Sequence, residues 1–328
     1  MKSASIAIAC LLIIGCSAKT APAPTPAAGG PAVAVDDLRV TGPYVHENLA
    51  VFLIHAPAAD DRDFLTLDEA LKSGDVVVTE KQNEQVAELE LENKGGRPVF
   101  IQEGDRVIGG KQDRIIGRSF VVPPRSGRMG VPSFCVEQGR WAGGEMRFAA
   151  GYSSQLAGKD VRLAAKCDSD QSEVWRKVAD LKKESESLGA SNTHTSLNET
   201  LENEKIKKLC EATAAALSGI LDRHPDAVGV AIALNGKVEE VNVYPTHRLM
   251  AKLYGRIIQS YAVVAAVKKS TAAAPACTDV AQLMKEAAAT KRSEKVAGNE
   301  FDLADGQKAY ACRTKYQGRL IHAQWMVK

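Results

Sequence analysis

Between Leu38 and Ala150 the hydrophobic residues come in short runs that suit β-strands. In VAELELEN, residues 86–93, leucines alternate with glutamates, which is typical of a strand with one buried face. Further runs are separated by glycine and proline and predict strands at AVFLIH, VVVT, PVFIQ, RVI, RII, SFVVP and GVPSFCVE. One short helix is predicted among them, with Thr66 as its N-cap, Glu69 three residues later and Gly74 as its end.

After Gly151 the spacing of apolar residues changes to that of helices. The predicted elements are a helix capped by Asp170, a longer helix from Ser196 to Leu221, a hairpin turning at Asn235-Gly236, a helix over 247–267 and a short helix over 279–289. The end of the chain predicts a three-strand meander that turns at Asp305-Gly306 and Gln317-Gly318. The expected fold class is therefore α+β: an antiparallel sandwich or barrel-like N-terminal half, helices packed with a β-hairpin in the C-terminal half, and the terminal meander.

The first residues, MKSASIAIACLLIIGCSAKT, have the pattern of a signal peptide that ends in a bacterial lipobox. In this interpretation Cys16 is lipidated, and because Ser17 rather than aspartate follows it, we expect an outer-membrane lipoprotein facing the periplasm. The alternative is an ordinary secretory signal with an incidental cysteine. The expected organisation is a signal peptide (1–16), a Pro/Ala-rich tether (17–37), a main domain (38–267) and a helix plus meander packed on it (268–328).

The composition limits which classes of partner are expected and how many disulfides can form. The chain has 42 Lys+Arg against 40 Asp+Glu, interspersed along its length, so no nucleic-acid partner is expected. Beyond Cys16 five cysteines remain, and an oxidising compartment allows two disulfides and one free thiol. Cys277 and Cys312 are the best candidate pair because both lie near the C-terminus. A Cys167–Cys210 pair would leave Cys135 as the odd thiol.

The stretch QEGDRVIGGKQDRIIGR (102–118) contains a Gly-Gly-Lys sequence but does not fit a phosphate-binding loop. Asp105 stands where the first glycine is needed, Gln112 replaces the magnesium-binding Ser or Thr, and a strand rather than a helix follows. Gly109-Gly110 is better explained as a turn between two strands. The six histidines show no i, i+4 pair and the chain has no CxxC, so neither a metal nor a cofactor is expected.

Two polar motifs carry the candidate chemistry. The first supplies Glu103, Lys111, Gln112 and Arg114, and the second supplies Glu137, Gln138, Arg140 and Trp141. These motifs, with others, resemble the family named for its association with ADP-ribosylglycohydrolases and rhodanese-phosphatases. The similar stretches, between about Tyr44 and Val264, are ENLAVF (47–52), LTLDEAL (65–71), EN (92–93), RPV (97–99), EG (103–104), GGKQ (109–112), Arg114, CVEQGRW (135–141) and 254–261. Asp113 departs from the family's usual asparagine. The resemblance implies a domain without an established activity, since the family name describes neighbours rather than chemistry.

Three hypotheses stay open for these motifs. If they meet on neighbouring strands, their charged groups beside Trp141 could bind a polar small molecule or a protein partner. The same groups could instead form an internal ion-pair lattice that binds nothing. Alternatively, Glu103 and Glu137 could act as the acid and base of a periplasmic hydrolase, or Cys135 as a nucleophile, although its apolar neighbours favour an inert thiol.

Overall fold

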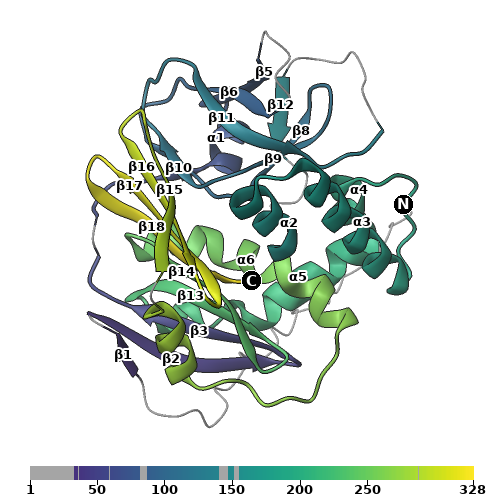
Figure 1. The fold of residues 1–328 in the computed structure, drawn as a ribbon, viewed down its shortest axis with the longest axis vertical. Coiled ribbons are helices and arrows are strands. Elements are labelled where there is room, and N and C mark those ends of the chain that lie inside the picture. Colours follow the sequence, from purple (N-terminus) through teal and green to yellow (C-terminus); the bar gives the residue numbers. More distant parts are fainter. Residues whose placement is uncertain are drawn as a thin grey trace, which may run out of the picture.

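Figure 1 shows the protein as a computed structural model in which a β-barrel, a long β-sheet and a group of helices lie against one another. The structure describes residues 33–35, 37–58, 60–81, 87–139, 147–150, 155–286 and 288–328. The expected α+β class is confirmed, with antiparallel sheets, a closed barrel and a C-terminal meander. Three residues of the sequence predictions lie outside the described residues: Cys16, which is the expected lipidation site, Arg140 and Trp141.

The barrel contains the short strands predicted before residue 150. Its strands follow one another around the barrel as β11 (Met129–Cys135), β6 (Glu88–Asn93), β5 (Val76–Glu80), β12 (Arg147–Ala150), β8 (Arg106–Gly109) and β9 (Arg114–Ile116). Beside it lies a small sheet of β10 (Phe120–Val122), β7 (Val99–Ile101) and β4 (Leu65–Thr66). Leu89 and Leu91 of β6 point into the barrel core, as their alternation with glutamate predicts.

The long sheet joins both ends of the chain. Its strand order is β1 (Val33–Val35), β2 (Leu38–His46), β3 (Leu49–His55), β13 (Ala227–Leu234), β14 (Lys237–Val243), β18 (Arg319–Val327), β17 (Ala309–Tyr316), β16 (Asn299–Gly306) and β15 (Ala288–Val296). The predicted meander is confirmed as β16–β18. Strand β15, which the sequence did not predict, pairs with β16 at the edge and is largely exposed. The segment after residue 267 therefore continues the same sheet.

Helices cover both faces of the central strands. Val230 and Ile232 of β13 pack in one core with α6 (His247–Val267), whereas Ala231 and Ala233 pack on the opposite face with α7 (Cys277–Met284). This alternation is the period of two expected of a strand with both faces buried. None of the described helices is both long and apolar enough to cross a membrane.

A third group of helices packs in one hydrophobic core with Ile115 of β9 and with Ala262 and Val263 of α6. It comprises α2 (Lys159–Leu163), the π-helical turn η1 (Ala164–Asp168), α3 (Gln171–Ser187), α4 (Leu197–Glu202) and α5 (Glu204–Ser218). The single long helix predicted from Ser196 to Leu221 is interrupted at Asn203, whose ψ is 129°. Its side chain accepts a hydrogen bond from Lys205 N and begins α5, because asparagine competes with the helix backbone and favours N-caps.

Several local predictions are confirmed in detail. Helix α1 (Leu67–Ser73) begins with a capping box of Thr66 and Glu69 and ends at Gly74, whose φ is 76°. Asn235 and Gly236 turn the β13–β14 hairpin with φ values of 52° and 78°. Gly109 and Gly110 also have positive φ, 122° and 54°, which supports the turn rather than the phosphate-loop interpretation.

Candidate functional site

Glu103 lies inside the protein and not on the polar patch that the sequence suggested. Its side chain is 1% exposed. It accepts hydrogen bonds from Ser119 and Gln324, and it lies 3.3 Å from Arg162 Nη1 and 3.5 Å from Lys166 Nζ. Burial alone would raise the pKa of Glu103, but the nearby charges of Lys166, His322 and Arg162 outweigh it and lower the pKa to about 2. Glu103 is therefore a buried, permanently ionised carboxylate.

A second carboxylate, Glu240, occupies the same interior network. Arg162 of α2 donates two hydrogen bonds to it, at 2.7 and 2.6 Å, and neither side chain has any exposed area. The hydroxyl of Tyr261 from α6 donates to Glu240 Oε2 at 2.7 Å, and Asn242 Nδ2 donates to Oε1 at 2.8 Å. Burial opposes ionisation here too, but Arg162 holds the pKa of Glu240 well below its usual range. The bidentate geometry is the strong form of an arginine–carboxylate pair.

This network, here called the buried charge network, joins elements that are distant in the sequence. It consists of Glu103, Arg162, Lys166, Glu240, Asn242, Tyr261, His322 and Gln324. Gly104 shows how closely the elements approach, because a Cβ atom at this position would lie 2.5 Å from Arg162 Cδ and the φ of the residue is +83°. The network satisfies charges inside the protein and leaves Glu103 no access to a dissolved substrate.

The other described members of the two motifs lie in a different place, around the β8–β9 turn. Arg114 of β9 is the register partner of Cys135 on β11, and Val136 N donates to Asp113 O at 3.0 Å. Gln112 Nε2 donates to the backbone oxygen of Glu137 at 3.0 Å. The structure thus brings residues 112–114 and 135–137 together, as the binding hypothesis required of the two motifs, but without Glu103.

Most of these side chains support the turn itself. The side chain of Arg114 is 1% exposed, and its Nη2 lies 3.7 Å from Oε1 of Glu80, which also accepts a hydrogen bond from Lys111 N. Asp113 Oδ1 accepts from Gly109 N at 2.9 Å, a contact that needs only an acceptor oxygen and that asparagine could also make. Gln138 is exposed, and its backbone nitrogen donates to Thr195 O.

The expected disulfide between Cys277 and Cys312 is absent. All five described cysteines are free thiols. Cys277 begins α7 and donates to Gly42 O, whereas Cys312 lies in a different hydrophobic cluster with Cys167. A hydrogen bond between the thiols of Cys167 and Cys312 raises the pKa of the first and lowers that of the second. Cys210 packs among the helices, so the Cys167–Cys210 pair is also not formed. Burial raises the pKa of Cys135, which makes it a poor nucleophile.

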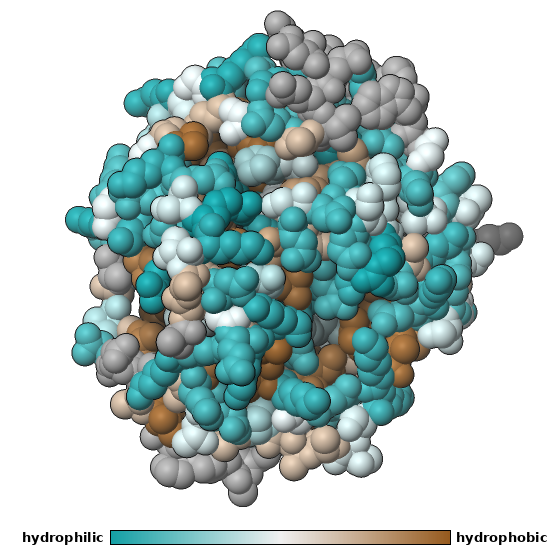
Figure 2. Space-filling view, viewed as in Figure 1, coloured by the Kyte–Doolittle hydropathy of each residue, from teal (hydrophilic) through white to brown (hydrophobic). Residues whose placement is uncertain are grey.

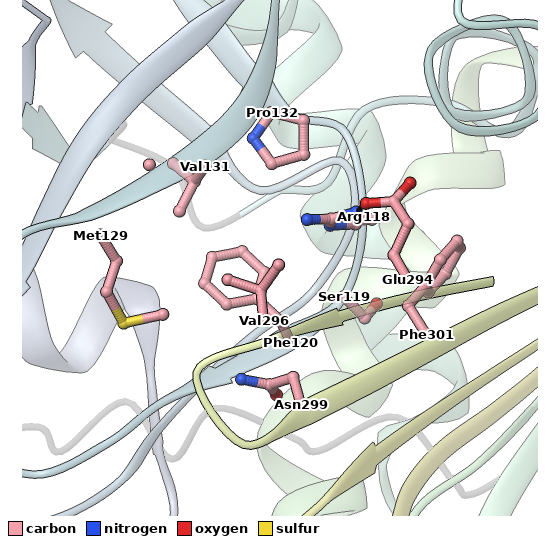
Figure 3. Close-up of a pocket in the computed structure, with 11 residues that line it drawn as sticks. Arg118, Ser119, Phe120, Met129, Val131, Pro132, Glu294, Val296, Asn299 and Phe301 are labelled. Atoms are coloured by element: carbon pink, nitrogen blue, oxygen red, sulfur yellow. Dashed lines mark hydrogen bonds and ion pairs between the residues drawn. The ribbon is translucent and has the colours of Figure 1, made fainter.

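A small hollow lies where the barrel meets the β15–β16 hairpin. Figure 3 shows Val131 and Pro132 of β11 on one side, Asn299 of the hairpin on the opposite side, and Phe120 and Val296 in the middle of the view. Arg118 and Glu294 form an ion pair at its end. The hollow has a volume of about 20 Å³, which is room for roughly one water molecule. It is therefore a small gap where the barrel packs against the β15–β16 hairpin, and it is too small for a ligand site.

A larger cleft lies beside the buried charge network, between α2, α3, α6 and the β13–β14 hairpin. Its volume is about 370 Å³. Apolar lining comes from Val161, Leu181, Leu234, Tyr261 and Val264, and charged lining from Lys159, Lys177, Lys237, Lys268, Asp160, Asp180, Glu184 and Glu239. Burial raises the pKa of Glu184, although Lys268 lies 3.6 Å away. Figure 2 shows that hydrophilic residues cover most of the face drawn and that hydrophobic residues reach it in separate patches.

Among the described residues, one group of histidine and aspartate side chains could hold a metal ion. It consists of His55, His224 and Asp226, with one ligand atom from each within 4.8 Å of the others. No sequence pattern indicated this group, because the spacing rules apply to ligands that are near one another in the chain, whereas His55 is far from His224 and Asp226. The structure brings these residues together by pairing β3 with β13.

Comparison with known proteins gives one result. No curated protein and no solved structure matches the chain. The sequence model of the "ARG and Rhodanese-Phosphatase-superfamily-associated Protein domain" matches residues 37–326, which extends beyond the motif-bearing stretch on both sides. The match covers both the barrel and the long sheet, and the chain therefore belongs to this family, as its motifs predicted.

Proposed function

We propose that the chain is an envelope-anchored binding module, held at the membrane through lipidated Cys16, and that it binds a small polar molecule in the cleft between α2, α3 and the β13–β14 hairpin. The observation that carries this proposal is the cleft itself. Its volume of about 370 Å³ is within the usual range for small-molecule sites, and it combines an apolar floor with charged walls.

The lining suggests which ligand chemistry fits. Four lysines face four acidic side chains, so the cleft has no net charge to favour a simple anion or cation. Some of these charges are paired with each other, including Lys159 with Glu239 and Lys268 with Glu184. Lys237 at the start of β14 is exposed and forms no ion pair with the part of the chain that is described. A ligand with both an anionic and a cationic group, such as an amino acid or a short peptide, would complement this arrangement.

The alternative function, a hydrolase that uses Glu103 and Glu137 as acid and base, has less support. A general acid needs a raised pKa and contact with the substrate. Glu103 has a lowered pKa and is 1% exposed. The backbone oxygen of Glu137 is occupied by Gln112, and its carboxylate lies near Asp113 N. Neither observation favours proton transfer to a bound molecule.

Thermal melts and calorimetry with a panel of free amino acids, dipeptides, sugars and nucleotides would test the binding function. We expect zwitterionic probes to raise Tm. Lys237→Ala and Glu184→Gln should weaken their binding by roughly 10- to 100-fold, as expected for losing a charged hydrogen bond of about 1.5–3 kcal/mol. Lys72→Ala, on α1 and 61% exposed, is the matched control and should bind as wild type does.

The cleft proposal is contradicted if no probe in the panel raises Tm, or if Lys237→Ala binds the probes with the same affinity as wild type.

The lipid anchor is tested separately, by following the protein in membrane fractions of cells that express wild type or Cys16→Ser. We expect the wild type to sediment with the envelope and the variant to be recovered in the soluble fraction. Membrane association that survives Cys16→Ser would contradict lipid anchoring at this residue.

A further inference from the structure

His55, His224 and Asp226 meet at one corner of the long sheet, away from the residues that line the cleft. His55 ends β3, and its register partner on β13 is Ala227. His224 and Asp226 lie in the turn just before β13, so the same strand pairing places all three side chains together. Their ligand atoms lie within 4.8 Å of one another.

One polar atom of each of the three side chains contacts a residue on β2. His55 Nε2 lies 2.7 Å from Thr41 Oγ1, and His224 Nε2 lies 2.6 Å from Tyr44 OH. Asp226 Oδ2 accepts a hydrogen bond from Arg39 Nη2 at 2.8 Å. Hydrogen bonding of the distal ring nitrogen is what orients histidine ligands in metal sites. The atoms that these β2 contacts leave available are Nδ1 of each histidine and Oδ1 of Asp226.

The Nδ1 atom of His55 lies inside the protein beside the carboxylate of Asp226. The His55 side chain is 3% exposed, and its Nδ1 lies 2.9 Å from Asp226 Oδ1. An imidazole nitrogen and a carboxylate oxygen this close together can bind one cation jointly.

We propose that His55, His224 and Asp226 form a binding site for a divalent transition-metal ion such as zinc. Two imidazoles and one carboxylate are ligands that zinc and its neighbours prefer over calcium or magnesium. Tetrahedral zinc with bonds of about 2.0–2.2 Å places its ligand atoms about 3.3–3.6 Å apart. The partly exposed His224 and the exposed Asp226 would reach these distances by rotating their side chains toward His55. Asp226 is 56% exposed, which gives the ion an entry path and leaves a position open to water.

A catalytic triad of Thr41, His55 and Asp226 is a weaker interpretation of the same atoms. The order of contacts, hydroxyl to Nε2 and Nδ1 to carboxylate, is that of a hydrolase triad. In such a triad the carboxylate is buried and hydrogen-bonded to the imidazole, whereas Asp226 is mostly exposed. The triad also leaves His224 and its contact with Tyr44 without a role, and the metal site accounts for both.

Equilibrium dialysis of the purified protein against Zn²⁺ tests the site, with the protein prepared without a polyhistidine tag and first stripped by a chelator. We expect one ion per chain and an increase in Tm on adding zinc. His224→Gln and Asp226→Asn should each weaken binding by at least about 100-fold, because the loss of a ligand costs more than the roughly 10- to 100-fold expected for an orienting partner. Tyr44→Phe, which removes only the hydroxyl that orients His224, should fall in that lower range.

His194→Gln is the matched control. His194 is 73% exposed and its Nδ1 lies 3.5 Å from Glu199, so it offers a histidine and a carboxylate at the surface, outside the proposed site. It should bind zinc as wild type does. The proposal is overturned if wild type retains no zinc, if His224→Gln and Asp226→Asn bind as tightly as wild type, or if His194→Gln removes the binding. Melts of the metal-free variants establish that they are folded.

Discussion

Arg162→Met tests whether the buried charge network stabilises the fold. Arg162 donates two hydrogen bonds to Glu240 at 2.7 and 2.6 Å, one to Glu103 at 3.3 Å and one from Nε to Ala157 O at 3.0 Å. Methionine has a similar length but no donor and no charge. The substitution leaves two buried carboxylates, 0% and 1% exposed, without their principal counter-charge.

The loss of folding stability expected for Arg162→Met can be estimated from these contacts. Hydrogen bonds to charged groups contribute about 1.5–3 kcal/mol each, so the three to carboxylates set an upper limit of roughly 9 kcal/mol. Donors that remain, including Lys166 near Glu103 and Tyr261 on Glu240, compensate in part. We therefore expect the loss typical of breaking a buried ion pair, about 3–5 kcal/mol. At about 2–4 °C per kcal/mol, Tm should fall by roughly 6–20 °C.

The assay is urea and thermal unfolding of wild type, Arg162→Met, Glu240→Gln and the double variant. The double variant should be more stable than the sum of the single losses predicts, by about 1–3 kcal/mol, because the two residues interact directly. Arg176→Met is the control, since this arginine of α3 is 57% exposed and its ion pairs with described residues are within the same helix, to Glu173 and Asp180. A Tm loss no larger than that of the control, or additive single variants, would refute the reasoning.

Three further predictions concern other parts of the fold. Burial lowers the pKa of His322 to about 4 from the ordinary 6.5, so the unfolded chain binds more protons between these pH values. Stability should therefore fall as pH drops from 6.5 to 4, by up to about 1.4 kcal/mol per pH unit, and urea titrations of His322→Gln should lack this component. Gly104→Ala should lower Tm much more than Gly74→Ala, because both have positive φ but only the first Cβ meets Arg162; equal losses would argue against this packing. A disulfide-forming oxidant, which takes up the two thiol hydrogens, should couple Cys312 to Cys167, and peptide mapping that finds Cys277 joined to Cys312 would contradict the structure.

The local elements could be predicted from the sequence because their determinants lie within a few residues. Thr66 and Glu69 predict the start of α1, Gly74 its end, and Asn235-Gly236 the hairpin, and each has the predicted geometry. Strand β15 was not predicted, because its local sequence lacks the pattern on which strand prediction depends. Its sequence, AATKRSEKV, has no apolar face because it is a largely exposed edge strand, where charged residues discourage pairing with other chains.

The environment of charged side chains was decided by the tertiary structure alone. In the sequence, Glu240 and Asn242 form the polar face of a strand and would be expected in solvent, yet both are 0% exposed. The partners that make this burial possible, Arg162 of α2 and Tyr261 of α6, come from other elements, and no local pattern indicates that they will meet. The same holds for His55 with His224 and for Cys167 with Cys312. A polar face in solvent and one paired inside the protein have the same sequence pattern, because the free energy that separates them depends on residues distant in the chain.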